Sequence, residues 1–178
     1  MEAIILQHIK IEDPGYIKDL MLSDGWNLTT IELDEGEKIP NDLNKFDVML
    51  CMGGPMDTWM EEKYPWLIEE KKRIKEFVVD KKKPFLGFCL GCQLLGEIVG
   101  GKVVKSKTSE IGIMNVEFLK HKQEDALFST FPKKIKALQW HSYEVKNLEN
   151  NKNITLLASS QTTKYQIFKY QNHAYGIQ

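Results

Sequence analysis

Apolar and polar positions alternate in blocks along the first half of the chain, and these blocks predict strands and helices in turn. Short apolar runs bounded by turn residues are typical of buried strands, whereas apolar residues that recur every three or four positions are typical of helices. The sequence therefore predicts strands at residues 3–9, 27–33, 46–52 and 83–89. Helices are predicted within residues 13–25, 64–82 and 90–101.

Each predicted helix has an apolar face that would pack on a sheet. The residues of these faces are, in chain order, Ile17, Leu20, Met21, Leu67, Ile74, Phe77, Val78, Leu94, Leu95 and Ile98. In the second helix Glu69 stands four residues before Arg73, a spacing that favours an ion pair on the helix surface.

After Gly101 the pattern changes to shorter β-rich segments, with strands predicted at residues 102–106, 112–119, 136–145, 153–160, 165–170 and 173–178. Strands that alternate with helices favour a parallel sheet. We therefore expect an α/β fold with one open, mainly parallel sheet flanked by helices, to which the second half adds antiparallel strands. No repeat or change of composition marks a boundary, so residues 1–178 are expected to form a single domain.

The composition excludes several classes of partner. Lysine and arginine number 24 against 25 aspartates and glutamates, and a net charge of −1 does not predict binding to nucleic acid or to an anionic membrane. No apolar run approaches the roughly 18–20 residues of a membrane span, and the N-terminus lacks the layout of a signal peptide. Three cysteines, two of them within an apolar run, fit a reducing compartment, so we expect a cytoplasmic protein.

One cysteine lies where a predicted strand passes into a helix. Cys89 is flanked by Gly87 and Gly91, which is the G-x-C-x-G form of a nucleophile elbow. The turn is so tight that a side chain at either glycine would collide with a neighbouring strand or helix. Because a helix N-terminus favours the thiolate, we expect the pKa of Cys89 to be lowered. The N–H of Leu90 would then point toward the oxyanion of a tetrahedral intermediate.

Other interpretations of the cysteines compete with the elbow. Cys89 and Cys92 form a C-x-x-C that could be a redox pair, although such pairs rarely need a glycine on both sides of the first cysteine. A zinc site needs more ligands at close spacing, and no second C-x-x-C or H-x-x-x-H occurs, so no metal or other cofactor is expected. Cys51 and Cys92 fit the role of buried apolar residues.

A second glycine-rich stretch, Gly53-Gly54-Pro55, directly follows the predicted strand 46–52. It should lie at the carboxyl edge of the sheet, where open α/β proteins bind ligands. Two glycines allow backbone N–H groups to approach a substrate and to supply the other half of an oxyanion hole. G-G-P is also a common turn, so the stretch gains its meaning from the elbow.

In chain order, five stretches resemble the class I (triad-type) glutamine amidotransferases. They are MGGPMD at 52–57, PFLGFCLGCQLLG at 84–96, SEIGIMNV at 109–116, LQWHSYEV at 138–145 and AYGIQ at 174–178. Within this family, the stretches are most similar to those of stand-alone proteins related to the glutaminase domain of GMP synthetase. The resemblance implies a flavodoxin-like fold and hydrolysis of the side-chain amide of L-glutamine, which gives glutamate and ammonia for an unknown acceptor.

The resemblance also implies roles for individual residues. Cys89 would attack the amide and form a γ-glutamyl thioester. The backbone N–H groups of Gly54 and Leu90 would hold the oxyanion, and Gly53 would bind the substrate beside them.

Further along the chain, Gln93 would line the glutamine pocket, and the backbone of Ser142 and Tyr143 would meet the α-amino and α-carboxylate groups. From the residues alone, Gln93 is explained equally well as a polar link between the elbow and a neighbouring loop. Glu110 lies in a matched stretch, and we expect its role to be structural.

The family's histidine and glutamate stand in F-H-P-E, directly after a strand that reads Y-G-x-Q. Here AYGIQ reaches Gln178, so the catalytic His/Glu segment is expected just beyond it, and residues 1–178 alone are expected to be inactive. His141 is the candidate substitute base because it lies on a matched loop. A hydrogen-bonded loop histidine beside Trp140 explains it better.

Three functions stay open at this point. The first is a glutamine amidotransferase whose ammonia acceptor is a synthase or a substrate on another chain. The second is a catalytically inactive binding or regulatory module that keeps the fold, and the third is a redox or stress protein that uses Cys89 as a sensor. γ-Glutamyl compounds are the alternative substrate class, which would make the protein a γ-glutamyl hydrolase.

Overall fold

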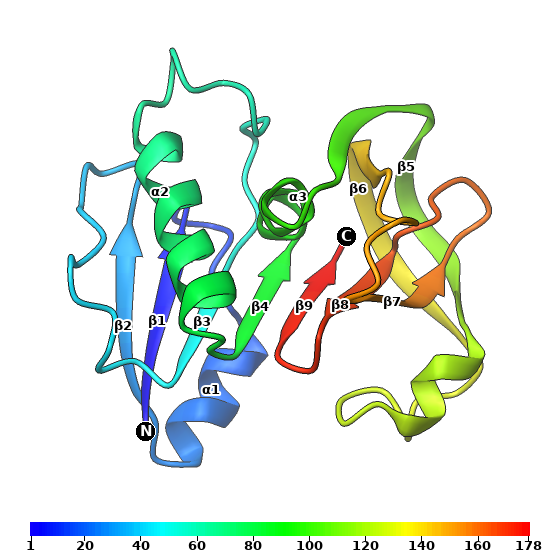
Figure 1. Ribbon diagram of the computed structural model, residues 1–178, viewed down its shortest axis with the longest axis horizontal. Coiled ribbons are helices and arrows are strands. Elements are labelled where there is room, and N and C mark those ends of the chain that lie inside the picture. The colour runs from blue at the N-terminus through cyan, green and yellow to red at the C-terminus, as the bar shows by residue number, and fades with distance from the viewer.

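The computed structural model describes residues 1–178, which form one nine-stranded sheet with helices packed against it (Figure 1). The strands are β1 (Glu2–Gln7), β2 (Asn27–Glu32), β3 (Val48–Cys51), β4 (Phe85–Phe88), β5 (Lys102–Phe118), β6 (Lys134–Lys146), β7 (Ile154–Ser159), β8 (Ile167–Tyr170) and β9 (Ala174–Ile177). The helices are α1 (Tyr16–Ser23), α2 (Trp66–Lys75), continued by the π-helical segment η1 (Glu76–Asp80), α3 (Leu90–Ile98) and the short 3-10 helix η2 (Lys120–Glu124).

The sheet has the order β2-β1-β3-β4-β9-β8-β7-β5-β6. Pairing is parallel from β2 through β9 and antiparallel from β9 to the β6 edge. The predicted α/β architecture is therefore confirmed: the first half of the chain builds the parallel part, and the second half completes it and adds the antiparallel strands.

Successive side chains of each parallel strand point to opposite faces, and each face has its own cover. Ile4, Met49 and Phe85 lie in the main core with the buried faces of α2 and α3. Ile5 and Leu50 lie in a smaller cluster on the opposite face, where residues of α1 pack. Buried on both sides, these strands read as the continuous apolar runs seen in the sequence.

The expected helix faces are largely correct. Leu67, Ile74, Phe77 and Val78 are all fully buried, and Arg73 Nε lies 2.7 Å from Glu69 Oε1 as the spacing predicted. The first helix is the exception: none of its residues is buried, and Leu20 is 46% exposed. Ile17 and Met21 are partly buried and pack against the cluster that contains Ile5 and Leu50.

Two of the predicted strands, 102–106 and 112–119, are wrong as separate elements because they are parts of the single strand β5. β5 pairs with β6 at residues 102–105 and again at 110–117, and the register shifts between Lys105 and Glu110. The polar residues 106–109 lie in this break between the two paired stretches, yet the strand runs through them. None of the helices is both long enough and apolar enough to cross a membrane.

The parallel strands β3, β4 and β9 end at the same edge of the sheet, which places three distant segments together. These are the glycine loop after β3, the start of α3 after β4, and Gln178 after β9. Figure 1 shows the end of β9 beside α3, in the middle of the sheet.

Candidate active site

Cys89 is the hinge between β4 and α3. Its backbone has φ 47° and ψ −101°, a left-handed conformation that is strained for a residue with a side chain. The strain is held from both sides, since the N–H of Cys89 donates to the carbonyl of Ile177 at 2.8 Å and its carbonyl accepts from the N–H of Gln93 at 3.0 Å. Such strain at a strand-to-helix turn is the physical mark of a nucleophile elbow.

The two flanking glycines are required for the reason that the sequence suggested. A Cβ on Gly87 would lie 2.5 Å from the carbonyl oxygen of Gly91, and a Cβ on Gly91 would overlap the carbonyl oxygen of Cys51. Both obstacles are backbone atoms, which cannot move aside as a side chain can. The elbow therefore admits no larger residue at either position.

The expected lowering of the Cys89 pKa is wrong. Burial raises the pKa of this thiol, and the nearby carboxylate of Glu12 raises it further, while the N–H of Leu90 and the side-chain amide of Gln178 oppose the shift; the result is a pKa of about 11. The amide nitrogen of Gln178 lies 3.8 Å from Sγ. The helix terminus does favour the thiolate, but desolvation outweighs it.

Cys51 and Cys92 are fully buried, and burial raises the pKa of both thiols well above the ordinary value. All three cysteines are free. Cys92 packs in the main core, as expected of an apolar residue. Cys51 does more than fill space, since its thiol donates a hydrogen bond to Glu70 Oε1 at 3.4 Å.

A cavity of about 650 Å³ opens in front of Cys89. It brings together most of the site residues that the sequence pointed to, namely Gly54, Cys89, Leu90, Gln93, His141, Ser142 and Tyr143. Gly53 is buried behind the wall rather than lining the cavity, although a Cβ there would lie 3.5 Å from that of Cys89. Glu12 also lines the cavity.

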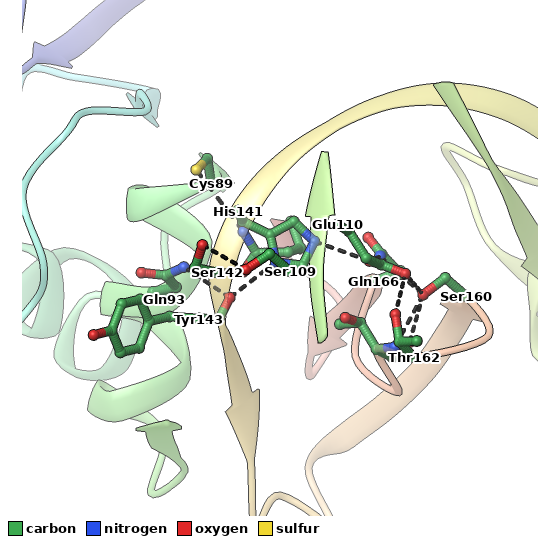
Figure 2. Close-up of polar contacts among 12 residues, drawn as sticks. Cys89, Gln93, Ser109, Glu110, His141, Ser142, Tyr143, Ser160, Thr162 and Gln166 are labelled. Atoms are coloured by element: carbon green, nitrogen blue, oxygen red, sulfur yellow. Dashed lines mark hydrogen bonds and ion pairs between the residues drawn. The ribbon is translucent and has the colours of Figure 1, made fainter. Parts of the chain in front are cut away.

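The polar side of this cavity is ordered by hydrogen bonds that Figure 2 shows. The amide nitrogen of Gln93 donates to the carbonyl of Tyr143 at 3.3 Å and to Oε1 of Gln178 at 3.2 Å. Ser109 Oγ donates to Ser142 Oγ at 2.9 Å. Gln93 thus both lines the cavity and ties the elbow helix to β6 and to the end of β9, so the two interpretations of this residue are compatible.

His141 is not arranged as a base for Cys89. Its Nε2 lies 3.0 Å from Glu110 Oε2 and its Nδ1 lies 3.0 Å from the carbonyl of Tyr143, so both ring nitrogens are engaged (Figure 2). The ring is buried, and no hydrogen bond joins it to the thiol. The simpler interpretation, a hydrogen-bonded structural histidine, agrees with this geometry.

Glu110 has the structural role that we expected. Its carboxylate accepts hydrogen bonds from Ser160, Thr162 and Gln166 in addition to the contact with His141. Burial alone would raise the pKa of Glu110, but the hydroxyl donors and His141 outweigh it and lower this pKa. The network clamps β5 to β6 and to the loop before β8.

A second buried cluster, which no pattern in the sequence indicates, lies beneath the glycine loop. His8 Nε2 lies 2.8 Å from Glu70 Oε1, and both side chains are fully buried. The donor atoms of His8, Cys51 and Glu70 all lie within 4.8 Å of one another, a grouping that has the chemistry of metal ligands. His8 and Cys51 are both hydrogen-bonded to Oε1 of Glu70, whereas Oε2 of Glu70 is buried without a partner. Because 62 residues separate His8 from Glu70, no local motif could reveal them.

The fold and this site define a class of protein: an open α/β domain that presents a cysteine on a strained elbow at the carboxyl edge of its sheet. The chain belongs to the class I glutamine amidotransferase family, whose family model matches residues 17–178. It is similar in structure to a glutamine amidotransferase of Thermotoga maritima, with a TM-score of 0.90 and 30% identity over 100% of this chain and 74% of that one. The predicted family and its fold are thereby confirmed.

Relatives by sequence include three kinds of protein. The glutamine amidotransferase-like protein YfeJ of Salmonella typhimurium is 26% identical over 100% of this chain and 74% of its own length. A subunit of the glutamine-hydrolysing GMP synthase of Saccharolobus solfataricus is 28% identical over 83% of this chain and 73% of its own. γ-Glutamyl peptidase 5 of Arabidopsis thaliana is 30% identical over 77% of this chain and 54% of its own.

Proposed function

We propose that the protein hydrolyses a γ-glutamyl amide, with L-glutamine as the substrate, through a thioester on Cys89. The observation that carries this proposal is the strained cysteine elbow that opens into the cavity. The sulfur attacks the amide carbon to form a tetrahedral intermediate, the thiol proton passes through the base to the amide nitrogen, and the C–N bond breaks to release ammonia. Water then attacks the thioester carbon, the C–S bond breaks, and glutamate and the free thiol are formed.

The remaining roles follow from position. Gly54 and Leu90 line the cavity together with Cys89, and their backbone N–H groups are proposed as the oxyanion donors. Gln93 and the backbone of Ser142 and Tyr143 form the polar side of the cavity, and they are proposed to bind the α-amino and α-carboxylate groups.

We propose that the base follows Gln178, because the histidine of the family directly follows the strand that matches AYGIQ. A thiol with a pKa of about 11 has only about one thiolate in ten thousand at pH 7, so the reaction needs a group that takes its proton. The side-chain amide nitrogen of Gln178 lies 3.8 Å from Sγ, so Gln178 is close to the sulfur, and we propose that residues following it bring the base to Cys89. We expect residues 1–178 without such a continuation to hydrolyse glutamine at a negligible rate.

A diazoketone analogue of glutamine tests the nucleophile without turnover. We expect 6-diazo-5-oxo-L-norleucine to add one adduct to Cys89, detected by peptide mass spectrometry, and excess L-glutamine to protect against it. Cys92→Ser, a matched change one helical turn away, should leave the adduct unchanged. Labelling that ignores glutamine would contradict a glutamine pocket and would favour an inactive module or a thiol sensor.

The γ-glutamyl peptidase relative supports a second candidate substrate, a γ-glutamyl peptide whose leaving group is an amino acid rather than ammonia. The cavity has room for both parts of such a substrate. Protection of Cys89 by L-glutamine and by a γ-glutamyl dipeptide at equal concentrations separates the two candidates.

The GMP synthase relatives support the further proposal that the ammonia is used by a synthase on another chain. The three free cysteines support a reducing compartment, and we propose the cytoplasm.

A further inference from the structure

The glycine loop of the site rests on a buried histidine. His8 directly follows β1, and its Nδ1 lies 2.8 Å from the carbonyl oxygen of Gly53. On the other side of the ring, Nε2 lies 2.8 Å from Glu70 in α2. The ring is fully buried and is stacked on Trp66 with centroids 5.6 Å apart. His8 is therefore held in one orientation by these neighbours.

The partners of the ring determine its protons. A carbonyl oxygen only accepts, so Nδ1 must carry a hydrogen and donate it to Gly53. Oε1 of Glu70 faces Nε2 and also accepts the thiol hydrogen of Cys51. Burial disfavours a charged ring, but Glu70 and the carbonyl of Gly53 outweigh it and raise the pKa of His8, to which Glu12 also contributes. The ring is thus fixed as a donor to Gly53 on one side and paired with Glu70 on the other.

The hydrogen bond from His8 to Gly53 and the proposed oxyanion donor of Gly54 belong to one peptide unit. The carbonyl of Gly53 and the N–H of Gly54 belong to the same planar trans peptide, so fixing the direction of one fixes the other. A hydrogen bond to the carbonyl oxygen also draws electron density toward that oxygen, which strengthens the N–H at the other end as a donor. Gly54 also packs on His8, since a Cβ there would lie 2.9 Å from that of His8.

We propose that His8, held by Glu70, is a positioning residue that orients and polarises the Gly53–Gly54 peptide so that the N–H of Gly54 meets the oxyanion. The inference rests on the proposed function, because it assigns a purpose to a donor of that site. It adds a component that lies behind the cavity wall and touches neither the substrate nor the sulfur.

Two substitutions separate the contact with Gly53 from the burial of a polar side chain. The amide nitrogen of asparagine can take the place of Nδ1, whereas that of glutamine extends to the place of Nε2. His8→Asn therefore keeps the donor to Gly53, and His8→Gln keeps the contact with Glu70 but loses that donor. Each is combined with Glu70→Gln, so that no unpaired carboxylate is left in the core.

Two reactions of Cys89 are then compared at one pH. The γ-(p-nitrophenyl) ester of L-glutamate acylates the sulfur: the S–C bond forms, the C–O bond breaks through an oxyanion, and p-nitrophenolate leaves without needing an acid. Iodoacetamide alkylates the same sulfur with loss of iodide and forms no oxyanion. The ratio of the two rates cancels the thiolate population and reports the oxyanion hole alone.

We expect the His8→Gln/Glu70→Gln variant to lower this ratio at least tenfold, since loss of an oxyanion donor costs about 10²–10³ in rate. The ratio for the His8→Asn/Glu70→Gln variant should stay within about threefold of that for the unchanged protein, because this variant keeps the donor to Gly53 in place. Equal ratios in both variants and in the unchanged protein would overturn the inference while the proposed function stood. If the unchanged protein forms no γ-glutamyl thioester with this ester, the proposed function fails and the inference falls with it.

Nitrogen-15 NMR of histidine-labelled protein gives a readout that needs neither folding of a variant nor reaction. We expect Nδ1 of His8 to carry a proton, because its partner is the carbonyl oxygen of Gly53, which can only accept. A lone pair on Nδ1 would overturn the inference, because the ring could not then donate to Gly53.

Discussion

Glu12→Gln removes one negative charge from the cavity wall beside Cys89. A Cβ placed on Gly53 would overlap a carboxylate oxygen of Glu12 and would lie 3.5 Å from the Cβ of Cys89, so the carboxylate and the elbow are close neighbours. A negative charge disfavours the thiolate and raises the pKa of Cys89, and its removal must therefore lower that pKa.

The size of the effect follows from Coulomb's law. Two unit charges roughly 6 Å apart, at an effective dielectric constant of about 40 for a half-exposed site, interact by about 1.4 kcal/mol, which is about tenfold in the thiolate population. A less basic thiolate is also a weaker nucleophile, by about threefold for such a change. The net alkylation rate near neutral pH should therefore rise about threefold.

The assay is alkylation by iodoacetamide from pH 7 to pH 11, followed by mass spectrometry of the peptide that contains Cys89. For the unchanged protein we expect the rate to rise steadily toward its pKa of about 11. Asp13→Asn is the matched control, because Asp13 is exposed and its side chain accepts only from the N–H of Gly15. A Glu12→Gln rate equal to that of the control, or a plateau of the unchanged protein below pH 9, would refute the reasoning.

The remaining predictions concern the elbow, the hydrogen-bond network of Glu110, and His141 as a candidate base. Limiting iodoacetamide should modify Cys89 before the fully buried Cys51 and Cys92, and faster labelling of Cys92 would contradict the elbow. Gly91→Ala should lower the free energy of unfolding by about 1–3 kcal/mol, measured by urea titration, because its Cβ overlaps a backbone carbonyl. Glu110→Gln should cost about 1–3 kcal/mol at pH 7. Since the pKa of Glu110 is lowered in the folded chain, this stabilisation is present above the ordinary value of 4.5 and is lost as the pH falls through the folded-state pKa, so the two urea midpoints should converge in acid. His141→Gln should leave alkylation of Cys89 unchanged, and a marked loss of rate would restore this histidine as a base.

The sequence by itself determined the elements and the elbow, because both depend on short-range constraints. Buried parallel strands must be apolar on both sides, and an amphipathic helix such as α2 must repeat its apolar residues every three to four positions. The steric demand for glycine at 87 and 91 is equally local, since the elbow turns within a few residues. The strand β5 shows the limit: its polar middle divides the sequence pattern into two segments, and only the structure shows that one strand runs through both, with a break in its pairing with β6 between Lys105 and Glu110.

The electrostatics of the site were decided by the tertiary structure. The helix N-terminus at Cys89 is visible in the sequence and predicts a lowered pKa, but the degree of burial and the carboxylate of Glu12 depend on how the loop after β1 folds over the sheet edge, and together they reverse the sign. His8 and Glu70 are 62 positions apart in the sequence, and no motif around either residue predicts that they form a pair. Desolvation and charge pairing act through space between distant segments, so a pattern read along the chain contains the groups but not their distances.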